Sequence, residues 1–419
     1  MTSPSLFRHR NFMLLFGADT ISQVGTQISM LALPLVAVLA LKASEFQTGL
    51  LVAAETAAFL LVGLPAGVWV DRMRRRRILI TADLVRGALL LSVPIAWWLD
   101  GLTLPQLYGV ALGMGLATVF FDISYQSYLP SLVGRERLVD GNAKLEIVRT
   151  TAGVAGPGVG GLLVQALTAP VAVLLDAISF LGSALFLWRI KATEQVPDRA
   201  ARRSLLKEIG EGLRFVATHR ILRMIAACTA TANFGSGILA AVEMIFLVRV
   251  VGLSPGSIGL LFSVAALGGL VGAASVSMVS RRVGTARIIW LSSLVTNPFM
   301  LLVPLAEPGW RMALFAVGMF MNGIGVVLYN VGQLSFRQSV TPEHMLGRMN
   351  ATMRFVVWGT IPLGGLVGGV LGELFGARTT LWISVALGLL SVVPLLLSPL
   401  RTMRDLPAAD QVDVRPSQP

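Results

Sequence analysis

Charged residues are scarce in this sequence, and their scarcity narrows the class of protein more than any other feature. Aspartate, glutamate, lysine and arginine make up 13% of the 419 residues, against roughly a quarter in an average soluble domain. A body of this size would therefore have too little polar surface to be solvated by water. Because 55% of the residues are hydrophobic and the mean hydropathy is +0.75, lipid is the expected solvent.

Residues and motifs that carry enzyme chemistry are also nearly missing. The single cysteine, Cys228, excludes an intrachain disulfide. The three histidines, His9, His219 and His344, stand far apart without metal-binding spacing, and there is no phosphate-binding loop of the GxxxxGK(S/T) type. We therefore expect no enzyme activity, no metal and no cofactor. Any driving energy would come from an ion gradient or from the substrate's own gradient.

What the sequence has instead is a series of long apolar runs. A helix needs about twenty mostly apolar residues to cross a bilayer, and an open sheet would leave backbone groups unpaired in lipid. The sequence therefore predicts an all-α polytopic membrane protein with twelve transmembrane helices. The expected spans are 12–41, 47–70, 78–99, 104–130, 141–166, 169–190, 222–250, 256–280, 286–306, 309–334, 349–374 and 377–399.

Positive charge is distributed unevenly among the connectors between these runs. The net charge is +12, and 28 of the 34 lysines and arginines lie near the termini or in every second connector. The alternate connectors hold Lys42, Arg249, Arg311 and Arg378. Because positive residues stay on the cytoplasmic side, we expect a plasma-membrane protein with both termini in the cytoplasm. Clusters set between spans argue against nucleic-acid binding and make membrane lipid the expected partner.

One long polar connector divides the chain. We expect a first six-helix half at 1–190, a linker at 191–221, a second six-helix half at 222–399, and a disordered cytoplasmic tail at 400–419. Within the linker, "SLLKEIGEGLRFV" has apolar residues at helical spacing. This pattern predicts an amphipathic helix on the cytoplasmic surface.

The two halves share landmarks at a nearly constant offset. It is 210 residues between His9 and His219 and between Gly49 and Gly259, and 208 residues between Asn142 and Asn350. These landmarks lie where spans begin or in equivalent connectors. They indicate a parallel duplication of a six-helix unit, an architecture of secondary transporters in which the substrate path lies between the halves.

The stretch "GLPAGVWVDRMRRRRIL" (63–79) resembles the loop signature of the major facilitator superfamily, between its second and third helices. The resemblance implies the major facilitator fold and a cytoplasmic gating loop formed by Gly67, Asp71, Arg72, Arg75 and Arg76. Arg74 stands where the family usually has glycine. "GPGVGG" (156–161) resembles the fifth-helix motif of drug–proton exporters, and "FFDISYQSYLPSLVGRERL" and "LLDAISF" resemble the branch of enterobactin-type and macrolide-type exporters.

Asp71 suits a latch on physical grounds as well. A carboxylate at a helix end accepts backbone N–H groups from a neighbouring helix start, and the helix dipole stabilises it by up to about 2 kcal/mol when it is partly buried. Such a contact can hold one conformation and release in the other. The alternative is that the arginine run at 74–77 only fixes topology and binds anionic lipid headgroups.

Small residues recur in the fifth span. Gly153, Gly156, Gly160 and Gly161 place small surfaces on one helix, and Pro157 removes a helix hydrogen bond. In lipid, small residues let two helix backbones approach closely. They predict either a tight, proton-sealing contact near the interface between the halves or ordinary helix packing.

Ionisable residues inside spans indicate functional sites, because burying a charge in lipid is costly. The candidates for proton coupling are Asp19, Glu55, Asp122, Arg149 and Asp176. One or two carboxylates would couple a proton to transport, or Asp122 and Arg149 would form a structural or gating pair. Many drug–proton antiporters carry an arginine in helix four, and 104–130 has none, so that role is vacant or belongs to Arg149.

Aromatic side chains suit an amphipathic pocket because they stack and present flat apolar faces. The substrate-cavity candidates are Phe120, Tyr125, Phe234, Tyr329 and Trp358. Most aromatic residues in a span face lipid or neighbouring helices instead.

These features together predict a secondary active transporter that works as a monomer. It would export an amphipathic small molecule, such as a drug, an antibiotic or a siderophore-like metabolite, by alternating access and proton antiport. Two alternatives stay open: a metabolite importer or uniporter of the same fold, and a non-transporting membrane receptor or assembly protein. The sequence names neither the substrate nor the stoichiometry.

Overall fold

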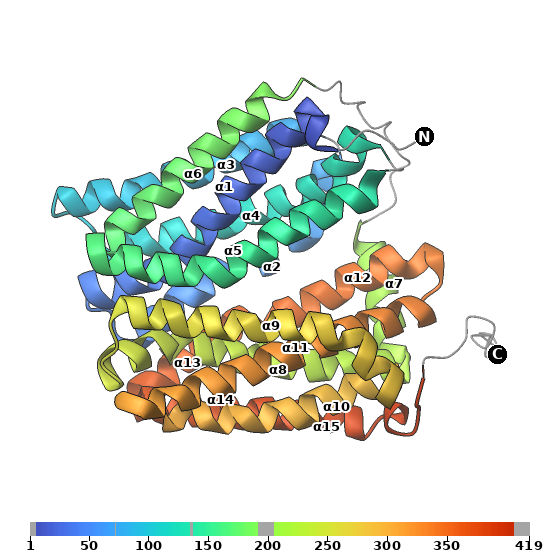
Figure 1. Ribbon diagram of the computed structural model, residues 1–419. Coiled ribbons are helices and arrows are strands. Elements are labelled where there is room, and N and C mark those ends of the chain that lie inside the picture. Colours follow the sequence, from blue (N-terminus) through green and yellow to red (C-terminus); the bar gives the residue numbers. More distant parts are fainter. Residues whose placement is uncertain (1–5, 72, 135–136, 192–204, 406–419) are drawn as a thin grey trace.

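The chain folds into two helical bundles that lie side by side (Figure 1). The computed structural model describes residues 6–71, 73–134, 137–191 and 205–405, and the regular structure in these ranges is helical throughout. Twelve segments in them are long and apolar enough to cross a membrane. The predicted all-helical membrane fold with twelve spans is therefore confirmed.

Six long helices build the first bundle. They are α1 (Arg10–Leu35), α2 (Glu45–Asp71), α3 (Arg75–Trp98), α4 (Leu104–Val133), α5 (Leu138–Leu167) and α6 (Ala169–Arg189), preceded by the 3-10 helix η1 (Leu6–Arg8). α6 packs against α1 and α3, whereas α2 and α5 make the contacts with the second bundle.

The second bundle repeats this arrangement with more interruptions. Its helices are α8 (Arg220–Ile245), α9 (Pro255–Val283), α10 (Arg287–Thr296), α11 (Met312–Val340), α12 (Glu343–Trp358), α13 (Thr360–Phe375), α14 (Ala377–Leu390) and α15 (Val393–Leu396), with short 3-10 turns η6 (Gly309–Arg311) and η7 (Pro399–Arg401). α9 and α13 face the first bundle.

A histidine cap starts the first helix of each bundle. Nδ1 of His9 accepts a hydrogen bond from the backbone N–H of Phe12 at 3.2 Å, and Nδ1 of His219 accepts one from Leu222 at 3.2 Å. Burial lowers the pKa of His219, which favours the neutral ring that can accept. Each cap satisfies one free N–H group of a helix start. Landmarks 210 residues apart are therefore equivalent structural positions.

The same two helices also end alike. α1 continues into the π-helical turn η2 (Val36–Ala40), and α8 continues into η4 (Phe246–Val250). The Leu41 N–H donates to the Val36 carbonyl at 3.1 Å, and the Val251 N–H donates to the Phe246 carbonyl at 2.9 Å, which is the i to i+5 spacing of a π-helix. The duplication therefore reaches the details of hydrogen bonding.

Two spans of the second bundle are interrupted midway. α10 passes into η5 (Asn297–Leu305), a nine-residue 3-10 segment that begins beside Pro298, whose missing N–H cannot continue the α-helical pattern. At Gly359 the chain passes from α12 to α13. The spans predicted at 286–306 and 349–374 are both present, although neither is one continuous α-helix.

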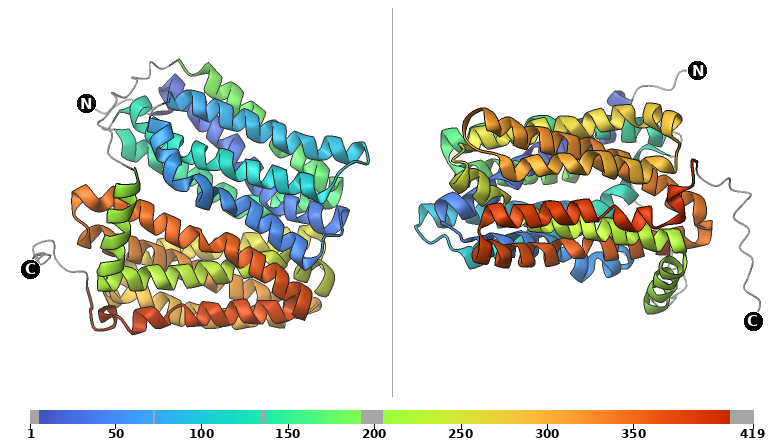
Figure 2. Two further views of the ribbon diagram at one scale, coloured as in Figure 1. Left: turned by 180° about the vertical axis from the view of Figure 1, so that it is seen from behind. Right: turned by 90° about the horizontal axis from the view of Figure 1, so that it is seen from below.

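The helix predicted in the linker is α7 (Leu205–Thr218); residues 192–204 lie outside the described ranges. α7 crosses the direction of the long helices (Figure 2) and packs against α12 and α8. The Arg348 guanidinium donates to the Glu211 carboxylate at 2.5 Å, and Gly212 lies against the backbone of Arg348. α7 is thus docked on the second bundle.

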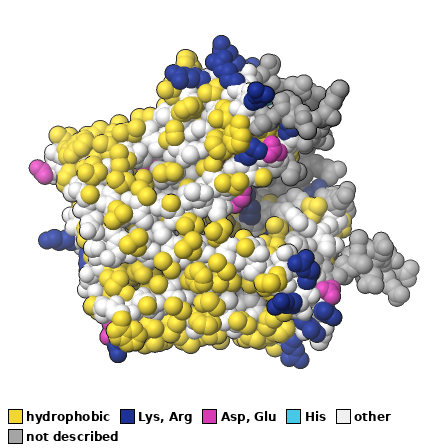
Figure 3. Space-filling model, in the orientation of Figure 1, with side chains coloured by type: hydrophobic (Ala, Val, Ile, Leu, Met, Phe, Trp, Pro, Cys, Tyr) yellow, Lys and Arg dark blue, Asp and Glu magenta, His cyan; other side chains and the backbone are white. Residues whose placement is uncertain are grey.

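Hydrophobic side chains cover most of the face shown in Figure 3, across both bundles. Lysine and arginine gather mainly toward the end of the molecule where the described chain begins and finishes. An apolar belt with charge at its ends is what a protein surrounded by lipid requires. The chain is therefore a multi-pass membrane protein.

Candidate functional site

The two bundles approach closely where α5 crosses α9. Gly161 faces Gly259, and a side-chain carbon added at either glycine would lie 2.9 Å from the Cα of the other. Nearby, the Gly256 N–H donates to Oε1 of Gln165 at 3.0 Å. The two glycines thus let the backbones come close enough for a hydrogen bond to join the bundles.

An equivalent crossing joins α2 to α13. A carbon added at Gly49 would lie 2.7 Å from the Cα of Gly369, and Oγ1 of Thr48 donates to a backbone carbonyl of α8 at 2.7 Å. Gly49 is 210 residues before Gly259, and Gly369 is 208 residues after Gly161. The two crossings are therefore equivalent contacts, in which the two bundles exchange roles.

Arg249, in the π-helical turn η4 that follows α8, adds a charged contact between the bundles. Its guanidinium donates to the carbonyl oxygen of Ala43 at 2.8 Å and to that of Val38 at 3.4 Å. The Phe46 N–H donates to the Glu373 carboxylate at 3.3 Å. The two glycine crossings and the Arg249 contact, here called the closed-end interface, lie at the end of the molecule opposite the described termini (Figure 1).

The bundles separate toward the other end. In the middle of α2, Phe59 still contacts Trp358, with ring centroids 4.8 Å apart, and Leu60 lies against Gly359. From there toward the described termini the ribbons of the two bundles diverge, as Figures 1 and 2 show from the front and from behind. The molecule is therefore joined at one end and splayed at the other.

The glycines of the fifth span divide between two faces of α5. Gly156 and Gly160 pack against α1 of the same bundle, whereas Gly161 and the carbonyl oxygen of Pro157 pack against α9 of the other. Gly153 faces open space. One helix thus makes both kinds of contact that the sequence left open, packing within its bundle and a close approach between bundles.

The predicted gating loop is described only in part. Arg72 lies outside the described residues, and for Gly67 and Asp71 only the backbone of α2 is described. Arg75 is half-buried. Arg76 donates through Nε to the Leu187 carbonyl at 3.0 Å and through its terminal nitrogen to the Trp188 carbonyl. These carbonyls end α6, where a cation is favourable, so Arg76 ties α3 to α6 within the first bundle.

Charged side chains gather inside the first bundle. Asp19 on α1, Asp83 and Arg86 on α3, and Asp176 on α6 are all at most 5% exposed. Asp83 forms an ion pair with Arg86, and Oγ of Ser183 donates to Asp83 at 2.6 Å. Buried charges need such partners because desolvation is costly. Asp19, Asp83, Arg86 and Asp176 form what we call the first-half charge cluster.

Arg86 holds this cluster against two aromatic rings. Its guanidinium carbon lies 4.2 Å from the ring centroid of Phe121 and 4.3 Å from that of Phe180, which adds cation–π attraction. Asp83 was absent from the sequence-based candidates. The available signal was its position three residues before Arg86 in an apolar run, since residues at this spacing meet on a helix.

Two of the predicted proton-coupling residues belong to the cluster. The Asp176 carboxylate accepts a hydrogen bond from Oγ of Ser179 at 2.8 Å, and a side chain added at Gly25 of α1 would collide with both. Asp19 lies within electrostatic range of Arg149. α1 and α6 therefore press together around Asp176 because position 25 carries no side chain.

The other predicted ionisable residues are more separated. Asp122 is half-buried on α4, and Arg149 is exposed on α5. They interact electrostatically, but in the part of the chain that the structure describes they form no ion pair. Asp122 also interacts electrostatically with Arg354 of α12, which belongs to the other bundle. Glu55 is exposed on α2.

The predicted aromatic candidates have different surroundings. Phe120 stacks on Trp69 with ring centroids 6.0 Å apart, and Tyr125 stacks on Phe121. Phe234 is half-buried on α8. Tyr329 is buried, and its hydroxyl lies 2.5 Å from Oγ1 of a threonine on α8. Tyr125 packs within the first bundle and Tyr329 within the second, whereas Trp358 contacts Phe59 of the other bundle.

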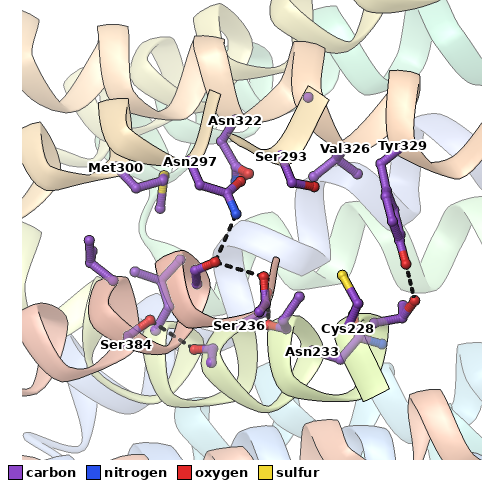
Figure 4. A pocket seen from close by; sticks show the side chains of 18 of the residues that line it. Cys228, Asn233, Ser236, Ser293, Asn297, Met300, Asn322, Val326, Tyr329 and Ser384 are labelled. Carbon is purple, nitrogen blue, oxygen red and sulfur yellow. Dashed lines mark hydrogen bonds between the residues drawn. The ribbon is translucent and has the colours of Figure 1, made fainter. Parts of the chain in front are cut away.

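The second bundle contains a polar cavity of about 150 Å³, here called the second-half cavity (Figure 4). It lies among α8, α10, η5, α11 and α14, and none of its lining residues is Asp, Glu, Lys, Arg or His. The polar lining residues are Cys228, Thr229, Asn233, Ser236, Ser293, Asn297, Asn322, Tyr329, Asn330, Ser384 and Ser391. Of the predicted site residues only Tyr329 is among them, because single amides and hydroxyls in a span give no signal in the sequence.

Comparisons with known proteins agree with this architecture. A family model described as Major Facilitator Superfamily matches residues 15–361. The chain is 27% identical over 404 residues to the multidrug efflux pump Tap of Mycolicibacterium fortuitum, covering 93% of this chain and 96% of that protein. It is 26% identical over 408 residues to the enterobactin exporter EntS of Citrobacter koseri, covering 95% and 94%. Among solved structures, the nucleoside transporter NupG has the same fold, with a TM-score of 0.75, 13% identity, and coverage of 91% and 97%.

Proposed function

The chain belongs to the Major Facilitator Superfamily, and from this premise we propose that it exports an amphipathic small molecule by alternating access, driven by proton antiport. Its family and its relatives make it a transporter of a small molecule and not an enzyme. Export is favoured over import because relatives along nearly the whole chain are named as efflux pumps and exporters.

The observation that carries the proton part of the proposal is the composition of the first-half charge cluster. Three carboxylic acids, Asp19, Asp83 and Asp176, are buried together. Arg86 pairs with Asp83 and interacts electrostatically with Asp176, whereas the arginine near Asp19 is Arg149. Three buried carboxylates with one buried arginine, Arg86, among them are unfavourable away from water if all are ionised, so the cluster suits a group that takes up and releases a proton. Asp19 is the proposed carrier, because Asp83 is held in the ion pair with Arg86 and Asp176 is fully buried, whereas Asp19 keeps 5% exposure.

The direction of opening fits export. With both termini in the cytoplasm of a cell whose plasma membrane holds the protein, the splayed end faces inward and the closed-end interface faces outward. This conformation would admit a substrate from the cytoplasm. Release outward would then require the closed-end interface to open and the gating loop at Asp71 and Arg72 to close the inner end. Each monomer holds a complete pathway between its two bundles.

The test is an efflux assay in cells that carry or lack the gene, with a panel of amphipathic antibiotics and cationic dyes. We expect lower accumulation of at least one compound in cells with the protein, and loss of this effect when an uncoupler collapses the proton gradient. Asp19→Asn should abolish efflux, because the amide cannot release a proton. Asp140→Asn, a change at an exposed carboxylate of α5, is the matched control and should keep it. Efflux that survives the uncoupler, or that Asp19→Asn leaves intact, would exclude the proton-coupling role.

A further inference from the structure

We infer that the second-half cavity is a binding subsite for an uncharged ring group that carries hydroxyl or amide groups, as one part of the transported molecule. Because the ligand is taken to be the exported substrate, this rests on the function proposed above. The cavity is formed entirely by residues of the second bundle, so it lies apart from the carboxylates proposed to move protons.

The cavity occupies the position in the second bundle that the charge cluster occupies in the first. At the offsets that relate the halves, each acidic residue of the cluster corresponds to a neutral residue that lines the cavity. At an offset of 210 residues, Asp19 corresponds to Thr229 and Asp83 to Ser293; at 208 residues, Asp176 corresponds to Ser384 and Ser183 to Ser391. The duplicated bundles have therefore diverged at these positions, with buried carboxylates in the first and neutral residues that line a cavity in the second.

Local contacts support this correspondence. Oγ of Ser384 donates to the Gly235 carbonyl at 2.8 Å, and its counterpart Asp176 lies against Gly25, which is 210 residues before Gly235. The α8–α14 contact thus repeats the α1–α6 contact. With serine in place of aspartate, the contact between helices is kept while no charge remains to be compensated.

The size of the cavity suits one ring group of a ligand and not a whole drug-sized molecule. A cavity of about 150 Å³ is the size that admits a six-membered ring, whereas pockets for whole drug-sized ligands span roughly 300–1,000 Å³. Ser236 and Asn330 line the cavity and are exposed. The remainder of a larger substrate could therefore extend past these residues.

The lining favours an uncharged ligand group that forms hydrogen bonds. Nδ2 of Asn297 donates to the Gly388 carbonyl at 2.8 Å, and Nδ2 of Asn233 donates to the Val357 carbonyl at 3.0 Å. Each amide is held through its nitrogen, which leaves the oxygen to accept a hydrogen bond from a ligand hydroxyl (Figure 4). A charged group would find no counter-ion in this lining and would lose its hydration without compensation.

Binding to the purified full-length protein in phosphatidylcholine nanodiscs tests the inference. The two probes are radiolabelled phenyl β-glucoside, an uncharged ring with hydroxyls, and tetraphenylphosphonium, a cation without hydrogen-bonding groups. Asn322 lines the cavity, and we expect Asn322→Leu to raise the Kd for the glucoside about tenfold, since a lost hydrogen bond and an apolar wall act together. The Kd for tetraphenylphosphonium should change less than twofold. Asn142→Leu, the same change at an exposed position of α5, should affect neither.

If Asn322→Leu lowers the melting temperature of the unliganded protein, Asn330→Leu, at the exposed part of the lining, takes its place. No binding of the glucoside to the wild-type protein would overturn the inference, and so would an equal loss for both probes. Gradient-driven export of other compounds would then still stand. Absence of gradient-driven export together with selective glucoside binding would instead defeat the proposed function and leave the cavity as a binding site.

Discussion

At the scale of single residues, the stability of the first bundle depends on the ion pair of Asp83 and Arg86. Both side chains are buried, and Arg86 also lies between two aromatic rings. Removing one member of a buried pair leaves a charge without compensation and typically costs about 3–5 kcal/mol. An exposed pair contributes about 0–1 kcal/mol, because water screens it.

We therefore expect Arg86→Gln to lower the melting temperature of the purified protein strongly. Asp83→Asn combined with Arg86→Gln should be more stable than Arg86→Gln alone, because the unpaired carboxylate is gone. The control is Arg311→Gln, which breaks an exposed pair with Glu307 and should have little effect. Equal losses for Arg86→Gln and Arg311→Gln would show that the buried pair does not stabilise this bundle.

The sequence was least able to predict which individual residues form a site. Asp19 and Asp176 could be chosen because a carboxylate in an apolar run is unusual. Asn297 and Asn322 could not be placed in a site, because their roles depend on which side of a helix faces inward and on which helices pack together. That information comes from tertiary contacts between residues far apart in the chain.

At the scale of elements, the fifth helix offers a comparison within one motif. Gly161 packs on Gly259 of the other bundle, whereas Gly153, two turns earlier, faces open space. A large side chain at Gly161 would have to displace a backbone, and overpacking of this kind typically costs about 1–3 kcal/mol. A side-chain carbon added at Gly153 has no neighbour within 4 Å.

Gly161→Leu should therefore lower efflux at least tenfold, because the closed-end interface cannot form, while Gly153→Leu should stay within twofold of the wild type. Initial efflux rates at matched protein levels in the membrane measure the difference. If the two substitutions reduced efflux equally, the effect would belong to the helix in general and not to its contact with α9.

The elements themselves followed well from the sequence, since a run of about twenty apolar residues has few alternatives in lipid. The change to 3-10 geometry at Pro298 and the π-helical ends of α1 and α8 were not predicted. Each is a local adjustment that leaves the apolar pattern unchanged. The docking of α7 through Glu211 and Arg348 was also missed, because amphipathic spacing does not tell whether a helix faces lipid or protein.

At the scale of the whole molecule, the two bundles are copies of one unit whose buried residues differ. The halves share the same histidine caps, π-helical ends and glycine crossings. The first bundle buries Asp19, Asp83 and Asp176 with Arg86, whereas neutral amides and hydroxyls line the second-half cavity. The duplication was visible in the sequence, but the conformational state was not, because the same residues must serve both states of a transporter.

The most direct test of proton-driven export uses the purified protein in liposomes with an acidic lumen and the membrane potential clamped at zero. Antiport predicts that radiolabelled chloramphenicol or tetraphenylphosphonium accumulates above the level in protein-free liposomes, and that nigericin or Asp19→Asn abolishes the excess. Accumulation that ignores the gradient, or that requires an acidic exterior instead, would contradict the account.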